Sequence, residues 1–205
     1  MVGNDIIDIC ETKRSTNWER SGFLQKIFTQ KEQEFIQDSA NPFRAIWQLW
    51  SMKESAYKVF IQTGADPFFK PSRIECDVES IESGSVKIGH TSLKTNTTRN
   101  SNYIFTTAVI DDSEIENRVF QIVESGSKFQ SVFMHEQVLS DFAKHNSLNR
   151  VELKIQKTGT GVPKLFYKNK PLKCSLSITH HGKYGAYSIL KNSIHEGEIS
   201  MNLEH

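Results

Sequence analysis

The sequence is short of the features that mark several common protein classes. Its 205 residues contain only five prolines and three cysteines, and lysine plus arginine barely exceed aspartate plus glutamate, 25 against 24. This near-equal number of positive and negative side chains argues against a dedicated nucleic-acid-binding domain, which is usually strongly basic. The cysteines, Cys10, Cys76 and Cys174, are odd in number and far apart, which fits a reducing, cytoplasmic location better than a disulfide framework.

Long apolar runs and familiar nucleotide-binding motifs are also missing. No run of about 18 apolar residues occurs, so neither a transmembrane helix nor a membrane partner is expected. The N-terminal segment MVGNDIIDIC has no basic flank, so it is not expected to be a signal peptide. The lack of a CxxC pair disfavours structural zinc. Neither GxxxxGK(S/T) nor GxGxxG is present, which excludes a P-loop and a Rossmann site.

Helical and strand-like stretches alternate along the N-terminal part of the chain. Thr29 and Glu32 form a capping-box pattern, and Asn41 followed by Pro42 is a second helix start signal. We expect a strand at residues 2–9, a helical region at about 17–36, a helix at 42–62, and an antiparallel meander of strands at 72–80, 85–93 and 102–110.

The same pattern then begins again. We expect a strand at 118–123, a helix at 128–145, and strands at 150–156, 164–168, 174–179 and 184–190. The sequence therefore predicts the α+β class, with two similar lobes that each pack helices on a small antiparallel sheet. The predicted divisions are a lobe at 1–112, a lobe at 117–192 and a tail at 193–205 that ends in Leu-Glu-His, like the start of a cloning tag.

Two carboxylates interrupt the apolar N-terminal strand, GNDIIDI. On a strand, Asp5 and Asp8 point to opposite faces, so only one of them is expected to line a given site. An aspartate among isoleucines loses solvation unless it meets a cation or hydrogen-bond donors. The alternative is an aspartate at a strand end that caps a turn.

A second cluster is WSMKESAYK at residues 50–58. Glu54 and Lys58 are four residues apart and therefore share one helix face, with Trp50 one turn earlier on the same side, whereas Lys53 points elsewhere. The alternative is an ordinary surface pair of glutamate and lysine, worth about 0.2–0.5 kcal/mol.

A third cluster is SLSITHHGKYGAYSI at residues 175–189. Hydroxyl side chains alternate with Leu176 and Ile178, as on a strand with one polar face, and His180 and His181 follow at its end. Hydroxyls, an imidazole and exposed backbone at a strand end can hold phosphate oxygens. The alternative is a plain hairpin that turns at Gly182 and Lys183.

Together the three clusters supply carboxylates, a lysine, a histidine and hydroxyls. Carboxylates bind Mg²⁺ through oxygen, and this ion shares its coordination shell with substrate phosphates. Lysine and histidine can neutralise the remaining phosphate charge. The sequence therefore predicts a site for a substrate that contains pyrophosphate.

These motifs resemble the signatures of the 4′-phosphopantetheinyl transferase superfamily. GNDIIDI is similar to its G-x-D-(I/V)-x-(E/D)-(I/L) element, and WSMKESAYK is similar to W-(S/T)-x-K-E-(S/A)-x-x-K, the most specific of the set. Further similar elements are IFTQKE at 27–32, GVPKL at 161–165 and SITHHGKYGAYSI at 177–189. The resemblance covers roughly residues 2–65 and 159–190.

The resemblance also carries an expectation about architecture. Short members of the family form trimers with sites between subunits, whereas members of about twice that length are monomeric pseudo-dimers with one site between two lobes. The length of this chain implies the second type. The lobe with G-x-D comes first here, which implies a swapped lobe order with residues 112–126 as the joint. The alternative is a short-type protein enlarged by residues 66–150.

The resemblance implies that the chain would transfer the 4′-phosphopantetheine arm of coenzyme A to a serine of an acyl or peptidyl carrier protein and release adenosine 3′,5′-bisphosphate. Asp5 and Glu54 would hold Mg²⁺, Lys58 would stabilise the transferring phosphate, and Glu54, or a metal-bound water beside it, would accept the serine proton. The residues implied to contact coenzyme A are Lys53, Lys58, Lys164, Ser177, Thr179 and His180.

Two departures from the family pattern leave an alternative function open. Ile7 stands where long members carry a second acidic ligand, and Val162 stands where a lysine often precedes the proline. A non-catalytic relative that binds coenzyme A or a carrier protein is the alternative reading. Lys13, Arg14, Arg20 and Lys26 are candidates for a basic patch that meets an acidic carrier, or they form a solvated helix face.

Overall fold

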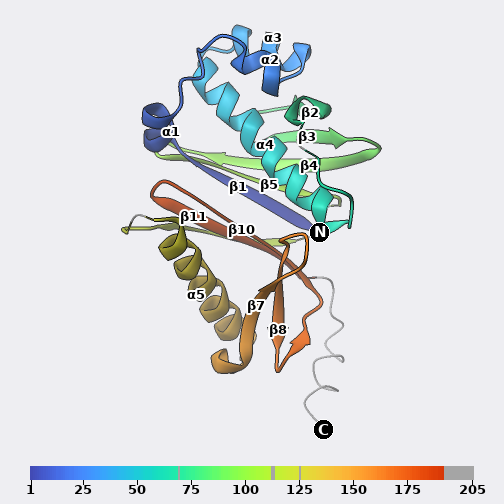
Figure 1. Ribbon diagram of the computed structural model, residues 1–205, viewed down its shortest axis with the longest axis vertical. Helices are drawn as coiled ribbons and strands as arrows, with labels where there is room; N and C mark the ends of the chain where they lie inside the picture. The colour runs from blue at the N-terminus through green and yellow to red at the C-terminus, as the bar shows by residue number, and fades with distance from the viewer. Residues whose placement is uncertain (69, 112–113, 125, 192–205) are drawn as a thin grey trace.

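The computed structural model describes residues 1–68, 70–111, 114–124 and 126–191 (Figure 1). The expected tail at 193–205 and part of the expected joint at 112–126 lie outside the described residues. Within them, two units lie one above the other, each with helices on the outer side of its main sheet, so that these two sheets face each other (Figure 1). The second unit also contains a separate three-stranded sheet. No helix among these residues is both long and apolar enough to cross a membrane.

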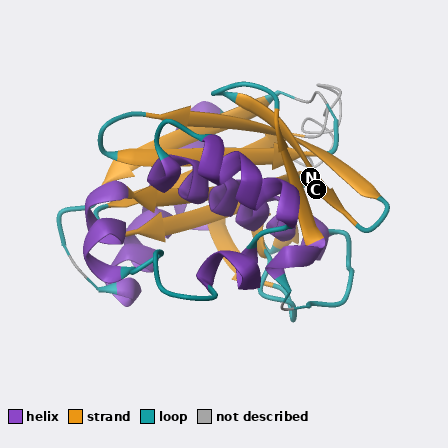
Figure 2. Cartoon of the chain, turned by 90° about the horizontal axis from the view of Figure 1, so that it is seen from above, coloured by secondary structure: helices purple, strands orange, loops and turns teal. Residues whose placement is uncertain are grey.

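The first unit is a five-stranded antiparallel sheet with the order β1-β5-β4-β3-β2, covered by helices (Figure 2). The long helix α4 starts at an N-cap, Asn41, whose side chain accepts a bond from the Arg44 N–H. The elements are β1 (Val2–Asp8), α1 (Ile9–Ser15), α2 (Phe23–Ile27), α3 (Gln30–Asp38), α4 (Pro42–Gln62), η1 (Pro71–Arg73), β2 (Ile74–Val78), β3 (Ser83–Ile88), β4 (Thr91–Arg99) and β5 (Tyr103–Val109).

The second unit follows a related plan. Its first strand pairs with its last, β6 with β11, as β1 pairs with β5, and the last strand also pairs with the strand before it. The elements are β6 (Ile115–Gln121), α5 (Ser127–His145), η2 (Arg150–Glu152), β7 (Leu153–Lys157), β8 (Pro163–Tyr167), β9 (Lys170–Pro171), β10 (Cys174–His181) and β11 (Tyr184–Lys191). The expected α+β class is confirmed.

Some expected elements differ from the structure. The strand expected at 85–93 is wrong, because the chain turns at Gly89, whose φ of 57° is in the left-handed region, and β3 and β4 form a hairpin around it. Helix α1 was not expected. It forms because Asp8 ends β1 and accepts the Glu11 N–H as an N-cap.

A close contact fixes α4 on the sheet. Gly3 faces the helix, and a Cβ at this position would collide with the carbonyl oxygen of Ser55. The buried Ser55 hydroxyl is 2.9 Å from the Thr106 carbonyl of β5 and donates to it. Small residues on both sides therefore let the helix lie directly on β1, which brings its polar face to the edge of that strand.

Each unit has its own apolar core, and smaller clusters join them. Val2 and Val109 pack against Leu190, and Ile6 and Phe105 pack against Ala186. These clusters bury apolar surface from β1 and β5 against β11, which stabilises the face-to-face arrangement of the two sheets.

Candidate active site

Side chains of β10 bond to the free edge of β1, along a line that we call the seam. Their oxygens and nitrogen take the place of the carbonyl groups that a neighbouring strand would offer. The bonds run from the N–H of Val2 to Ser175 Oγ (2.9 Å), of Asn4 to Ser177 Oγ (3.0 Å) and of Asp8 to His181 Nδ1 (2.9 Å). The polar face that the sequence predicted for the strand now identified as β10 is thus the surface that joins the two units.

A cavity of about 200 Å³ lies at the end of the seam, which we call the seam cavity. It receives side chains from both units, because β1, α1 and α4 of the first meet β10 of the second there. Its lining residues are Asp5, Ile6, Ile7, Thr12, Thr16, Trp47, Trp50, Glu54, His180 and His181.

Asp5 is buried in this cavity with one oxygen bonded and one free. Its Oδ1 accepts a hydrogen bond from Thr179 Oγ1 (3.2 Å) and lies 3.6 Å from Lys58 Nζ. Its Oδ2 is buried without a hydrogen-bond partner among the described residues. Burial raises the pKa of Asp5, an effect that the Lys58 ammonium and the Thr179 hydroxyl partly oppose.

Glu54 and Lys58 project from α4 toward the same place. Lys58 Nζ donates to the Asn4 carbonyl (2.6 Å), which holds the ammonium beside β1. Burial raises the pKa of Glu54, the nearby Asp5 carboxylate raises it further, and Lys58 lowers it. Both carboxylates thus lie where their negative charge is poorly solvated, which favours a bound cation.

The donor set fits a magnesium ion. No group of three or more potential metal ligands occurs among the described residues. Mg²⁺, however, typically binds through one or two carboxylates and completes its shell with waters and phosphate oxygens. Asp5 Oδ2, buried without a partner, and the carboxylate of Glu54 are donors of that kind.

Ile7 and Asp8 contribute no oxygen to the set of candidate magnesium ligands. Ile7 belongs to the buried core of the first unit. Asp8 uses both oxygens, because Oδ1 accepts the Glu11 N–H (3.0 Å) and Oδ2 accepts the Lys183 N–H (2.8 Å). Asp8 thus caps α1 and holds the turn between β10 and β11.

Two histidines of β10 line the opposite wall. His181 Nδ1 accepts a hydrogen bond from the Asp8 N–H, so a neutral His181 carries its proton on Nε2. Burial lowers the pKa of His180, and the positive charge of Lys58 lowers it further. The lowered pKa favours the neutral imidazole of His180 in the free protein.

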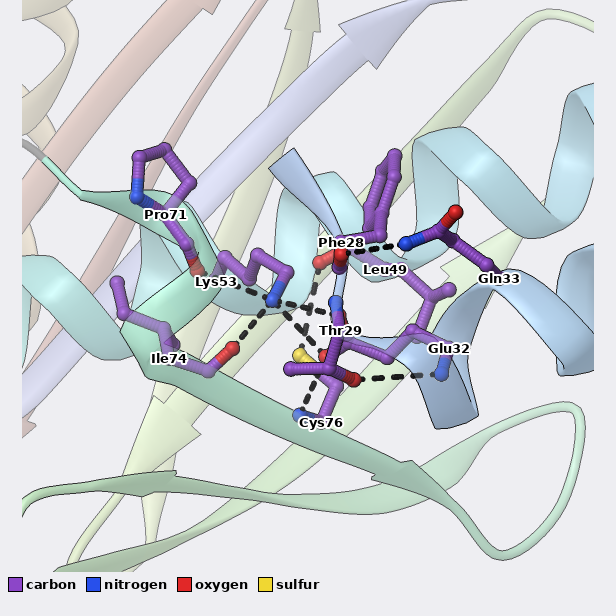
Figure 3. Close-up of polar contacts among 9 residues, drawn as sticks. All are labelled: Phe28, Thr29, Glu32, Gln33, Leu49, Lys53, Pro71, Ile74 and Cys76. Atoms are coloured by element: carbon purple, nitrogen blue, oxygen red, sulfur yellow. Dashed lines mark hydrogen bonds and ion pairs between the residues drawn. The ribbon is translucent and has the colours of Figure 1, made fainter. Parts of the chain in front are cut away.

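Two residues expected at coenzyme A lie elsewhere. Lys53 is 1% exposed, 2.8 Å from Glu32 Oε2, and donates to the carbonyl groups of Pro71 and Ile74 (Figure 3). The ammonium therefore lies in a buried ion pair outside the lining of the seam cavity, which disfavours the expected contact with coenzyme A. Lys164 is exposed on β8 and does not line the seam cavity.

Ser177 is also occupied elsewhere. It is 2% exposed, and besides accepting the Asn4 N–H it donates to Asn4 Oδ1 (2.8 Å). The same Asn4 side chain donates to Ser188 Oγ of β11 (3.0 Å). Ser177 therefore joins the two units, and a ligand in the seam cavity does not reach it without breaking these bonds.

Sequence reasoning missed three residues near the cavity. Trp47 could have been found, because it lies three residues before Trp50 and seven before Glu54, on the same helix face. Thr12 lies on the unexpected helix α1. Lys157 gave no local signal, because it comes close to His180 only through the folding of β7 and β8 beside β10.

A sequence model of the 4′-phosphopantetheinyl transferase superfamily matches residues 1–111, more than half of the chain. The chain belongs to this superfamily. The matched segment contains Asp5, Glu54 and Lys58, so the first unit carries the family's sequence and supplies most of the lining of the seam cavity.

Two individual proteins are similar to parts of this transferase-family chain. The holo-(acyl-carrier-protein) synthase of Caldanaerobacter subterraneus subsp. tengcongensis is 40% identical over 58 residues, which is 28% of this chain and 45% of the relative. The chain thus matches less than half the length of that curated relative. A crystal structure of holo-(acyl-carrier-protein) synthase from Thermotoga maritima aligns over 83% of each chain with 12% identity and a TM-score of 0.42.

Proposed function

We propose that this chain transfers the 4′-phosphopantetheine group from coenzyme A to a serine hydroxyl of an apo acyl or peptidyl carrier protein. The released product is adenosine 3′,5′-bisphosphate. The observation that carries the proposal is the seam cavity, where Asp5 and Glu54 of a family-matched unit lie with an unpartnered carboxylate oxygen, opposite His180 of the other unit.

The carboxylates prepare the cavity for the pyrophosphate of coenzyme A. Asp5 and Glu54 would hold Mg²⁺, which would supply positive charge to neutralise the phosphates. Thr179 is a positioning residue, because its hydroxyl bonds to Asp5 Oδ1, while Oδ2 has no hydrogen-bond partner among the described residues. Lys58, held by the Asn4 carbonyl, places an ammonium beside the phosphate that is transferred.

Glu54 is the group that accepts the serine proton. The serine oxygen forms a bond to the phosphorus that carries the pantetheine, and the bond from that phosphorus to the bridging pyrophosphate oxygen breaks. The electron pair of the broken bond leaves on adenosine 3′,5′-bisphosphate.

The second unit contributes positive and polar groups to the anionic substrate. His180 is half-buried in the cavity wall and neutral in the free protein, so it can donate one N–H to a phosphate oxygen without adding charge. Lys157 lies close enough to lower the pKa of His180 and adds a cation on the same side. Lys157 would then supply the positive charge that other family members often have from a lysine at the position of Val162.

The two units form one site within one chain, so we also propose a monomeric pseudo-dimer with lobes at 1–112 and 117–192. The carrier protein would approach over α1 and α2. Exposed Lys13, Arg14, Arg20 and Lys26 lie on or next to these helices, and Thr12 of α1 lines the cavity. Acidic residues around the modified serine of a carrier would be attracted to this surface.

The test is an intact-mass measurement on apo carrier proteins after incubation with this chain, coenzyme A and Mg²⁺. The expected result is a mass gain of one phosphopantetheine, which is lost with EDTA and with the Lys58→Ala variant. Measurable binding of coenzyme A without any mass gain on acyl and peptidyl carriers would contradict transfer and favour the non-catalytic alternative.

A further inference from the structure

Three residues that line the seam cavity each have a buried polar side-chain atom without a hydrogen-bond partner. Among the described residues, side-chain atoms in this condition are Asp5 Oδ2, Thr12 Oγ1, Trp47 Nε1 and Thr95 Oγ1, and the first three belong to cavity residues. A buried polar group without a partner costs about 1–3 kcal/mol. Their concentration in one cavity therefore indicates a ligand that satisfies them.

Thr12 and Trp47 form a part of the cavity distinct from the carboxylates. They are 2% and 7% exposed, and they come from two helices, α1 and α4. Trp47 precedes Glu54 by seven residues, which is two turns or about 10 Å along the helix axis. The cavity thus extends along α4 from a charged end at Glu54 to a neutral end at Trp47.

The chemistry of the neutral end restricts its ligand. The indole N–H of Trp47 can only donate, so the ligand must bring an acceptor, whereas the Thr12 hydroxyl can donate or accept. Ile7 and Trp50 add apolar surface to the same cavity lining, and both pack in or against the core cluster that contains Trp47. The ligand group is therefore uncharged and partly apolar, with an acceptor close to a second polar atom.

One part of coenzyme A has this composition. The atoms that follow the transferred phosphate are a methylene, a carbon with two methyl groups, a carbon with a hydroxyl group, and an amide carbonyl. We propose that Thr12 and Trp47 bind this α-hydroxy amide of the pantoyl group. The amide oxygen accepts from Trp47 Nε1, the hydroxyl bonds to Thr12 Oγ1, and the methyl groups contact Trp50.

This inference rests on the proposed function and adds a specificity determinant to it. The pantoyl contacts hold the arm while its phosphate is transferred, and they do not read the thiol end. Adenosine 3′,5′-bisphosphate, which lacks the arm, makes none of these contacts.

The test compares two ligands on two variants that each remove one polar atom. Thr12→Val replaces the hydroxyl by a methyl group of similar size, whereas Trp47→Phe removes the N–H together with the five-membered ring. Titration calorimetry with Mg²⁺ should show that each variant binds coenzyme A about three- to tenfold more weakly, the equivalent of one hydrogen bond, while its affinity for adenosine 3′,5′-bisphosphate is unchanged. Trp18→Phe and Thr95→Val are matched controls, because they remove the same groups outside the cavity.

Several outcomes would overturn the inference. Equal losses for both ligands would mean that the substitutions disturb the whole site. Unchanged coenzyme A affinity with a raised KM for the carrier protein would assign the subsite to the carrier. If the wild type transfers phosphopantetheine and both variants bind like it, only the subsite is wrong. If the wild type binds neither ligand, the proposed function is wrong as well.

Discussion

At the scale of single residues, the site is built from groups that are poorly satisfied in the free protein. Burial raises the pKa values of Asp5 and Glu54, and Asp5 Oδ2 has no partner among the described residues. Each of these groups lowers the stability of the fold without a ligand. The same groups gain the most when a cation and phosphates enter, which is how a site is prepared for its substrate.

The first prediction concerns Glu54→Gln. We expect this variant to be more stable than the wild type at neutral pH, by on the order of 1 kcal/mol or ~2–4 °C in Tm, because a poorly solvated charge is removed. Transfer should be lost, since an amide cannot accept the serine proton. Calorimetry and the intact-mass measurement check both parts, and a variant that is active or clearly less stable would contradict the assignment.

The pH dependence of that gain has a definite sign. The folded protein binds more protons than the unfolded chain between the ordinary pKa of glutamate and its raised value in the fold, so wild-type stability falls as pH rises through this window. The Glu54→Gln variant has no titrating group at this position, so its stability does not fall in this pH window. The difference in Tm should therefore be small near pH 4 and larger at pH 7, and a constant difference would count against a raised pKa.

The second prediction separates structure from binding at Lys53. Breaking the buried pair with Lys53→Met should cost about 3–5 kcal/mol in a urea titration, because Glu32 keeps its charge without its partner. The double variant Lys53→Met/Glu32→Gln should recover much of this loss, since it buries no charge. The KM of the double variant for coenzyme A should equal that of the wild type. A raised KM in the folded double variant would indicate that Lys53 contacts coenzyme A after all.

The residue motifs pointed to the charged residues of the seam cavity and missed Thr12 and Trp47, which also line it. Helical spacing placed Glu54 and Lys58 on one face, and strand alternation separated Asp5 from Asp8, as the structure shows. Spacing could not tell that Lys53, one residue from Glu54, meets Glu32 in the core. That contact depends on how α3 packs on α4, which no local pattern encodes.

At the scale of elements, the position of α4 on β1 determines the distance between Asp5 and Lys58. Gly3 and Ser55 provide the space for this approach, and Ser55 also bonds to β5. The helix start at Asn41 and Pro42 was readable, because caps are local signals. The extra turn at Gly89 was not, because strand-like residues flank the glycine on both sides.

The third prediction concerns Gly3→Ala. The added methyl group would collide with the Ser55 carbonyl, so the helix must move, and we expect a loss of about 1–3 kcal/mol together with weaker transfer. Gly159→Ala is the matched control, since no atom lies near its Cβ position and its φ is not positive. Urea titrations and kinetics check both. A Gly3→Ala variant with full stability and activity would show that the close approach is not required.

At the scale of the whole molecule, the seam cavity joins the two units. β10 bonds to the edge of β1 through side chains, and small apolar clusters connect the sheets. The repeated round of strand, helix and strands in the sequence predicted two similar halves. It could not predict which edges meet, because the contact between β1 and β10 spans more than 170 residues of sequence.

The last prediction tests whether one chain holds a complete site. Glu54→Ala removes a cavity residue of the first unit, and His180→Ala removes one of the second, so each variant alone should lose most transfer. If sites formed between chains, as in a short-type trimer, a mixture of the two variants would contain some sites with neither defect. In a monomeric pseudo-dimer every site carries one defect, so the mixture should be no more active than its parts. Light scattering should give the mass of one chain, 23.5 kDa. If mixing the two variants restored activity, the active site would have to form at an interface between subunits.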